Sequence, residues 1–316
     1  MIQKLSLKIS RWIVKKVERF PSSTRKNFDV LMNIALPIRL LKDRIYISKL
    51  SQISKQIFVI DEKIGFCQLP PLDADSEQMI NLARKCKELV LAGELQRHNS
   101  KEYLQQIFDM SNINRDSLFL LELGLNPNLL LSIQRYLHSY PLLHEVSVFY
   151  SPESISDFTS ENFAGSQLFH RDGGGTKCLK LWLLCEDVSK ENGPTVLIPS
   201  GISHEISKRL NYHPGDKISD SKFLTSELAQ AVPLTGKKGD WFATDTDNCF
   251  HYGSRTTKKS SRLVIMFHYV EHNSSYYMPF LRQNYIRKLK PLSPAVKEFC
   301  QTNVYAARSL RYRLSL

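Results

Sequence analysis

The pattern of apolar and polar positions in this chain changes its period near residue 145. Before that point, apolar residues recur at three- and four-residue steps, which is typical of helices with one buried face. The pattern predicts helices over residues 76–91, 101–110, 115–123 and 127–138. Ser76 is suited to cap the first of these helices, and Gly93 lies just past its end. The first half of the chain is therefore expected to be mainly helical.

After residue 145 the pattern is typical of short β-strands separated by turns. Strands are predicted at Val146–Tyr150, Leu179–Leu184, Thr195–Ile198, Trp241–Thr244 and Arg262–Val270. Asn192-Gly193 is a strong signal for a tight turn. Two earlier segments could also be strands, Ile57–Ile60 and Gly65–Leu69. Many short strands with turn residues between them indicate a sandwich or barrel, and a last helix is expected between Pro294 and Leu316.

The first 20 residues have the pattern of an amphipathic helix. Its apolar face would consist of Ile2, Leu5, Ile9, Trp12, Ile13, Val17 and Phe20. Lysines and arginines take most of the other positions, so the helix could lie on an anionic membrane surface. The alternative is that its apolar face docks on the body of the protein, as most amphipathic helices do. Nucleic-acid binding is not expected, because no recognisable binding motif accompanies the basic residues.

The distribution of charge divides the chain into two parts. The 316 residues carry a formal net charge of +12. Residues 1–60 contain 13 Lys or Arg and 3 Asp or Glu, which leaves 30 and 28 for the remainder. We therefore expect a basic helical extension over residues 1–60 and a nearly neutral domain over residues 61–316, with its catalytic core at about residues 145–270.

The overall composition is that of a soluble globular protein, with 42% apolar and 23% charged residues. The six cysteines include no Cys-x-x-Cys pair, and we expect them to be buried thiols in a reducing compartment. Neither a secretory signal nor an apolar run of membrane-spanning length is apparent. These features predict a cytoplasmic protein whose contact with a membrane, if any, is peripheral and made through residues 1–20.

His170 and Asp172 are the first candidates for chemistry. They lie in Ser166–Gly175, where an apolar strand end precedes three glycines. Their two-residue spacing puts both side chains on one face of a strand, with Arg171 pointing away. A second histidine, His251, follows 79 residues after Asp172. Two histidines and one carboxylate make the facial triad of non-heme iron(II) oxygenases, which leaves coordination positions open for reactants.

The sequence His170-Arg-Asp172 also occurs in the catalytic loop of protein kinases. A kinase needs an asparagine five residues after the aspartate, where this chain has Lys177, and an Asp-Phe-Gly motif, which this chain lacks. The kinase interpretation is therefore excluded.

A longer set of motifs occurs in the order typical of one oxygenase family. The set comprises His170-x-Asp172, Trp182, Glu191-Asn-Gly193, Pro199–His204, Gly239-Asp240-x-Phe242, His251 and Arg262. With these motifs the chain resembles the phytanoyl-CoA dioxygenase family of iron(II)- and 2-oxoglutarate-dependent oxygenases, well over about residues 145–270 and loosely over residues 60–145. The resemblance implies a double-stranded β-helix (jelly roll, cupin-like), an α+β protein with a mainly β core and flanking helices.

The resemblance also implies a role for each matching residue. His170, Asp172 and His251 would bind Fe(II). Arg262 would pair with the far carboxylate of 2-oxoglutarate, and Trp182 would line the 2-oxoglutarate pocket. A guanidinium suits this role because it holds a carboxylate through two parallel hydrogen bonds.

Several neighbouring residues have two interpretations. Arg255 competes with Arg262 for the carboxylate, but it lies only four residues after the distal histidine and is expected in a turn. Lys180 and His268 have the strand parity of pocket residues, although lysines usually point to solvent and a buried histidine is more often a hydrogen-bonded core residue. His204 is expected to orient a loop, which is longer here than the Pro-Gly-Ser-His usual in the family.

These assignments predict an enzyme that couples decarboxylation of 2-oxoglutarate to hydroxylation of a small-molecule or lipid-like substrate. It would consume O2 and release succinate and CO2, with ascorbate as an accessory reductant. Two alternatives remain open: a non-catalytic jelly-roll binding protein tethered by its basic N-terminal helix, and a metal enzyme of the same barrel type that uses no 2-oxoglutarate. The substrate itself is not predicted, because specificity in such barrels comes from loops and added helices.

Overall fold

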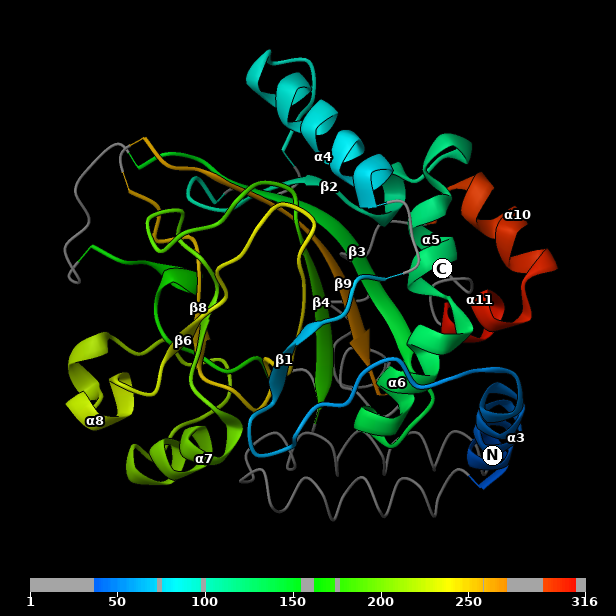
Figure 1. Ribbon diagram of the computed structural model, residues 1–316, viewed down its shortest axis with the longest axis horizontal. Coiled ribbons are helices and arrows are strands. Elements are labelled where there is room, and N and C mark those ends of the chain that lie inside the picture. The colour runs from blue at the N-terminus through cyan, green and yellow to red at the C-terminus, as the bar shows by residue number, and fades with distance from the viewer. Residues whose placement is uncertain are drawn as a thin grey trace, which may run out of the picture.

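Two antiparallel sheets form the framework of the protein (Figure 1). The computed structural model describes residues 37–72, 76–97, 101–154, 162–173, 177–257, 259–271 and 292–310, with only the backbone of residues 37–43. The large sheet has six strands in the order β1 (Phe66–Leu69), β7 (Trp241–Thr244), β4 (Cys178–Leu184), β9 (Arg262–Val270), β3 (Leu142–Ser151) and β2 (Gln105–Phe108). The small sheet has three strands in the order β6 (Val232–Pro233), β5 (Val196–Leu197) and β8 (His251–Tyr252).

The segment around His170 extends the small sheet beyond its named strands. Phe169 forms a bridge with Ile218, and His170 forms one with His251 at the start of β8. The chain alternates between the two sheets, running from β4 in the large sheet to β5 in the small one and from β7 in the large sheet to β8. The two facing sheets make a double-stranded β-helix, so the predicted jelly roll is confirmed.

The helices lie mainly on the outer side of the large sheet. The α-helices are α3 (Pro37–Ile53), α4 (Ser76–Leu91), α5 (Phe119–Gly124), α6 (Pro127–Leu137), α7 (Ser200–Arg209), α8 (Thr225–Leu228), α10 (Pro294–Thr302) and α11 (Val304–Ser309). Short 3-10 helices occupy Met110–Asn112, Arg115–Ser117, Gly165–Gln167 and Asp220–Lys222. Figure 1 shows α5, α6, α10 and α11 on one side of the large sheet, with α7, α8 and the small sheet on the other.

The alternation of side chains along β4 explains how the large sheet serves two purposes. Leu179, Leu181 and Leu183 are fully buried in the main core, which the outer helices share. Lys180 and Trp182 point to the opposite side, where they line a cavity between the sheets. Because successive residues of a strand face opposite ways, one strand supplies both core packing and pocket chemistry.

Local sequence explains the helices that the pattern predicted correctly. In α4, Met79, Ile80, Ala83 and Cys86 form the buried stripe. The amino end of α6 is capped by Asn126, whose side-chain oxygen accepts a hydrogen bond from the amide of Asn128 at 2.9 Å, and proline takes its first position.

Three local predictions were wrong. The helix expected over residues 101–110 is instead the edge strand β2, because Gln105 and Gln106 pair with Tyr150 and Phe149 of β3. Residues 57–60 form no strand. The loop expected at Pro199–His204 is the start of α7, whose Ile206 is fully buried in a cluster with Phe250.

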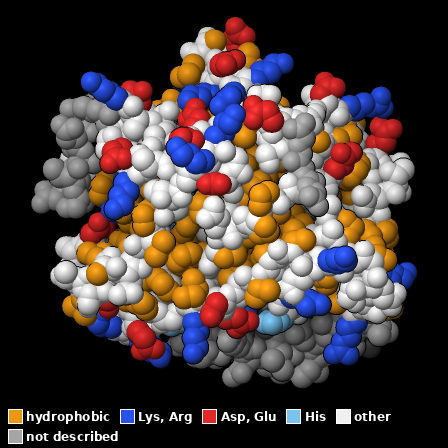
Figure 2. All heavy atoms as spheres, viewed as in Figure 1, with side chains coloured by type: hydrophobic (Ala, Val, Ile, Leu, Met, Phe, Trp, Pro, Cys, Tyr) orange, Lys and Arg blue, Asp and Glu red, His pale blue; other side chains and the backbone are white. Residues whose placement is uncertain are grey.

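The predicted extension is described only in part. The helix expected over residues 1–20 lies outside the described residues, whereas Leu50 and Phe58 are buried in the main core. The division of the chain at residue 60 stays a prediction. Among the described helices, none combines the length and apolar character needed to cross a lipid bilayer. On the face shown in Figure 2, basic and acidic side chains of the described residues intermingle.

Candidate metal centre and cosubstrate pocket

The backbone holds His170 and His251 directly opposite each other. The amide of each donates a hydrogen bond to the carbonyl of the other, at 3.0 and 2.9 Å. Such a pair of opposed residues projects its side chains to one face, and the two imidazole rings lie 4.2 Å apart between centroids. His170 and His251, which are far apart in the sequence, are thus neighbours because the segment that contains His170 pairs with β8.

Asp172 joins the two histidines because it lies two residues after His170 on an extended segment. Its amide donates to the carbonyl of Thr246 at 2.8 Å. Its Oδ1 lies 3.7 Å from Nε2 of His170, and its Oδ2 lies 3.9 Å from Nε2 of His251. We refer to His170, Asp172 and His251 as the triad. Its three ligand atoms all lie within 4.8 Å of one another.

Hydrogen bonds to backbone carbonyls fix the tautomer of both imidazoles. Nδ1 of His170 lies 2.9 Å from the carbonyl of Leu168, and Nδ1 of His251 lies 3.1 Å from that of Cys249. A carbonyl can only accept, so each Nδ1 carries the proton and each Nε2 presents a lone pair toward Asp172. Burial lowers the pKa of His170 to about 4 and that of His251 well below its usual value, so both rings are neutral at pH 7.

Lys180 of β4 keeps the carboxylate of Asp172 ionised. Its ammonium nitrogen lies 2.6 Å from Oδ2 of Asp172. Burial by itself would raise the pKa of Asp172, but the attraction of the Lys180 ammonium outweighs burial and brings that pKa well below its usual value. The triad thus presents two neutral nitrogen donors and one charged oxygen donor.

The opposite face of the same segment is held by Arg171, which points away from the triad as predicted. Its Nε donates to the carbonyl of Asp247 at 2.8 Å, and its Nη1 donates to Ser207 of α7 at 2.9 Å. Asp245 in the same loop accepts hydrogen bonds from the amides of Asp247 and Asn248, at 3.0 and 3.1 Å. These contacts brace the loop that leads from β7 into His251.

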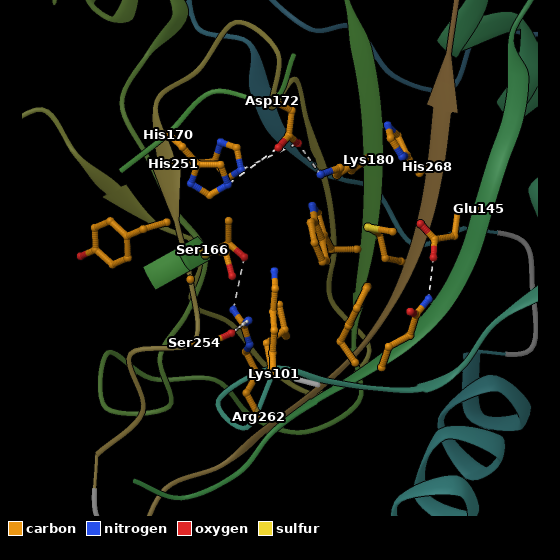
Figure 3. A pocket seen from close by; sticks show the side chains of 18 residues that line it. Lys101, Glu145, Ser166, His170, Asp172, Lys180, His251, Ser254, Arg262 and His268 are labelled. Atoms are coloured by element: carbon orange, nitrogen blue, oxygen red, sulfur yellow. Dashed lines mark hydrogen bonds and ion pairs between the residues drawn. The ribbon is translucent and has the colours of Figure 1, made fainter. Parts of the chain in front are cut away.

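A cavity of about 450 Å³ opens beside the triad, between the two sheets. Figure 3 shows the triad at one end, Arg262 at another, and Lys180, His268 and Glu145 along the wall formed by the large sheet. Trp182 also lines the cavity, and its ring nitrogen donates to Thr244 at 2.9 Å.

Arg262 is a buried cation without an acidic partner among the described residues. It is 4% exposed, and its hydrogen bonds to other described residues run to the hydroxyls of Thr195 and Ser254, at 3.2 and 3.1 Å. Within the described part of the chain, its Nε has no hydrogen-bond partner. Burial lowers its pKa to about 10, which still leaves it charged at pH 7. A guanidinium in this state is suited to receive an anion that enters the cavity.

Arg255 has its own partner in the structure. Nη1 and Nη2 each donate to one oxygen of Asp220, both at 2.7 Å, and its guanidinium stacks 3.5 Å from the ring centroid of Tyr252. It does not line the cavity. Of the two arginines, Arg262 is therefore the one that faces the triad across the cavity.

The remaining candidates divide in the same way. Lys180 and His268 line the cavity, whereas His204 lies on α7 away from it. Sequence reasoning missed Glu145 and Lys101, which also line the cavity. Glu145 has the strand parity of Ser147 and Phe149, so its direction could have been predicted, whereas Lys101 lies in a segment that was assigned to a helix.

The sequence of this region matches a known family. Residues 156–264 match the family model for phytanoyl-CoA dioxygenase (PhyH), and that range contains all three triad residues, Trp182 and Arg262. This region is therefore similar in sequence to the phytanoyl-CoA dioxygenase family. The resemblance drawn from the motifs is thereby confirmed.

The chain is also similar to a curated protein and to several solved structures. Phytanoyl-CoA dioxygenase 1 of Oryza sativa subsp. japonica is 24% identical over 147 residues, which are 45% of this chain and 51% of the rice protein. The chain thus spans about half the length of that relative. The carbocyclase SnoK from nogalamycin biosynthesis is 16% identical, with a TM-score of 0.49 over 73% of this chain and 89% of SnoK. HygX from Streptomyces hygroscopicus, solved with nickel and 2-oxoglutarate, is 14% identical, with a TM-score of 0.45 over 67% of this chain and 84% of HygX.

Proposed function

We propose that this protein is an Fe(II)- and 2-oxoglutarate-dependent dioxygenase that hydroxylates a small-molecule or lipid-like substrate and releases succinate and CO2. The single observation that carries the proposal is the pairing of two features across one cavity. The triad supplies a metal-binding donor set, and Arg262 supplies a buried positive charge that no described acidic residue neutralises. A five-carbon dicarboxylate that binds a metal at one end needs such a partner at the other.

The donor set of the triad fits a divalent transition metal. Two Nε2 lone pairs point at a carboxylate 3.7 and 3.9 Å away with no proton between them, an arrangement that is repulsive until a cation enters. Two imidazoles and one carboxylate are the ligand type of non-heme iron(II) oxygenases. When bound, Fe(II) would supply coordination positions for 2-oxoglutarate and the redox chemistry that activates O2.

The residues of the chain would then bind, orient and enclose the reactants. Arg262, held by Thr195 and Ser254, would receive the distal carboxylate of 2-oxoglutarate. Trp182, with its ring fixed by Thr244, would form an apolar wall of the 2-oxoglutarate site. Lys180 would keep Asp172 charged and fix its orientation, so that the carboxylate enters the metal site as an anion.

Three accessory parts of the proposal concern surroundings and partners. Ascorbate would serve as an accessory reductant. All six cysteines are free thiols in the structure, which supports a reducing, cytoplasmic location. Peripheral contact between residues 1–20 and an anionic membrane surface remains a prediction from the sequence pattern.

Two alternatives make different predictions. A non-catalytic binding protein would keep the cavity without turnover. Such a protein would not require an ionised Asp172 and two imidazoles with unprotonated Nε2 atoms beside Arg262. A metal enzyme that uses no 2-oxoglutarate would leave Arg262 without a ligand.

The test is release of succinate from 2-oxoglutarate by the full chain with Fe(II) and ascorbate, with and without candidate substrates. The wild type is expected to release succinate slowly even without a substrate, and Asp172→Ala is expected to release none. Equal rates in the wild type and in Asp172→Ala would overturn the proposal. Activity on a substrate without any 2-oxoglutarate would favour the second alternative.

A further inference from the structure

Three more metal-binding side chains converge on the large sheet, outside the triad. They are His144 and Glu145 of β3 and His268 of β9, which we call the second cluster. Each offers one ligand atom, and these atoms all lie within 4.8 Å of one another. His144 and His268 are 1% and 4% exposed, and their rings lie 5.1 Å apart between centroids at 85°.

A β-bulge brings the second cluster together. In a regular strand, neighbours such as His144 and Glu145 would face opposite sides of the sheet. Here the pairing with β9 shifts: Leu143 is opposite Tyr269, whereas Glu145 is opposite His268. One extra residue on β3 is thereby accommodated, and both side chains approach His268. Bulges of this kind re-aim side chains and are frequent next to functional sites.

The donor atoms of the second cluster are prepared for a cation. Glu145 is oriented by two hydrogen bonds to its Oε1, from the side-chain Nε2 of Gln106 at 2.5 Å and from the hydroxyl of Ser147 at 2.7 Å. Partners of this kind fix a ligating carboxylate in other metal sites.

We propose that His144, Glu145 and His268 form a second binding site for a divalent first-row transition ion, with zinc as the expected occupant. The combination of imidazole and carboxylate ligands selects such ions over calcium and magnesium, which prefer oxygen ligands alone. Glu145 and His268 line the cavity, so an ion bound there lies in the wall of the cavity rather than in the outer core (Figure 3).

The second site is separate from the triad but is electrostatically connected to it. Lys180 lies opposite His268 in the sheet and forms its ion pair with Asp172. Without Asp172, the positive charge of Lys180 would no longer be neutralised and would repel a cation at the second cluster. A test of the second site must therefore empty the triad without disturbing this ion pair, which His251→Ala does.

The experiment counts zinc and cobalt(II) ions bound to the tag-free full chain after chelator treatment. Calorimetry gives the zinc stoichiometry, and the visible spectrum of cobalt(II) reports the ligand set. We expect two ions in the wild type, one in His251→Ala, one in His144→Ala and none in the double variant. His204→Ala is the matched control, because it removes a histidine of α7 that lies away from both sites, and it should keep two ions.

A second variant keeps the test decisive if His144→Ala does not fold. Glu145→Gln preserves the shape of the side chain, and in the His251→Ala background it should weaken zinc binding by about tenfold or more. The proposal is overturned if folded His251→Ala binds no zinc, or if Glu145→Gln in that background leaves the zinc affinity unchanged. Both outcomes concern binding alone, so they do not depend on oxygenase activity.

Discussion

The ammonium nitrogen of Lys180 lies 2.6 Å from Oδ2 of Asp172, and both side chains line the cavity. Burial alone would raise the pKa of Asp172 and lower that of Lys180. Their mutual attraction outweighs burial, so the pKa of Asp172 falls well below its usual value and that of Lys180 rises. The ion pair with Lys180 therefore keeps Asp172 ionised beside two neutral imidazoles in the metal-free protein.

Lys180→Met should destabilise the metal-free protein. The substitution leaves an unpaired carboxylate in the cavity, which costs about 3–5 kcal/mol of stability when the carboxylate is completely buried. The Asp172 side chain is 21% exposed, so we expect a loss of about 1–3 kcal/mol here. A divalent ion can replace the lost positive charge, so the rise in Tm on adding metal should be larger in the variant than in the wild type. Lys101→Met, which alters another lysine of the cavity wall, is the control. An unchanged Tm in metal-free Lys180→Met would contradict the role given to this ion pair.

Arg262→Met should weaken 2-oxoglutarate binding while sparing the metal. Loss of one partner in a buried, charged hydrogen-bonded pair costs about 2–5 kcal/mol, which corresponds to a rise of about 30-fold or more in the KM for 2-oxoglutarate. Arg255→Met removes another arginine side chain, one that pairs with Asp220 instead, and it should leave that KM within about threefold of the wild-type value. Similar losses in both variants would argue against Arg262 as the carboxylate partner.

Gly193→Ala should lower the unfolding temperature of the protein and also weaken 2-oxoglutarate binding. Gly193 has φ of +62°, and a Cβ there would lie 2.7 Å from backbone atoms of Arg255 and Thr256. The neighbouring Ser254, which donates its amide to the carbonyl of Gly193 at 3.0 Å, contacts Arg262. A loss of roughly 2–4 kcal/mol in the free energy of unfolding is expected from strain plus backbone displacement.

Gly215→Ala is the matched control for this prediction. Gly215 also has positive φ, +96°, but nothing lies within 4 Å of an added Cβ. It should show only the conformational part of the cost, about 1–2 kcal/mol. Denaturant unfolding of both variants measures the difference, and equal losses would show that the close approach at Gly193 has no energetic effect.

Lys217 should react with acylating reagents at unusually low pH. Partial burial and the charges of Lys101 and Lys180 lower its pKa to about 8, against the attraction of Asp172. At pH 8 about half of its amines are therefore unprotonated and reactive, whereas an ordinary lysine is almost fully protonated there. Lys237, whose pKa is raised by its hydrogen bond with Asp187, is the internal comparison. Mass spectrometry after pulse labelling across pH 6–11 gives both midpoints; a midpoint for Lys217 near that of Lys237 would be inconsistent with the structure.

Much of the framework could be predicted from the sequence because its signals are local. The stripe of α4 and the alternation of β4 each identify their element and its buried face. The same alternation places His170 and Asp172 on one side and Arg171 on the other. For Lys180 and His268, parity gave the correct direction, but it could not decide between a pocket and the core.

The parts that could not be predicted depend on pairing between distant segments. Gln105 and Gln106 form a strand only because the edge of β3 is available to them, and the local pattern there favours a helix. The bulge that turns His144 and Glu145 toward the same histidine, His268, arises from the register between β3 and β9, and no local motif marks that register. The partner of Arg255, Asp220, lies 35 residues away at the start of a short 3-10 helix that the sequence pattern did not predict.

The most direct test of the central claim is an anaerobic optical titration of the wild type with Fe(II) and then 2-oxoglutarate. Chelation of Fe(II) by the keto acid gives a charge-transfer absorption in the visible range, before any oxygen chemistry takes place. The wild type is expected to develop this absorption with one 2-oxoglutarate per chain, Asp172→Ala to develop none, and Arg262→Met to require far more 2-oxoglutarate. Absence of the absorption in the iron-loaded wild type, or its full retention in Asp172→Ala, would show that the triad is not the site of an Fe(II)- and 2-oxoglutarate-dependent reaction.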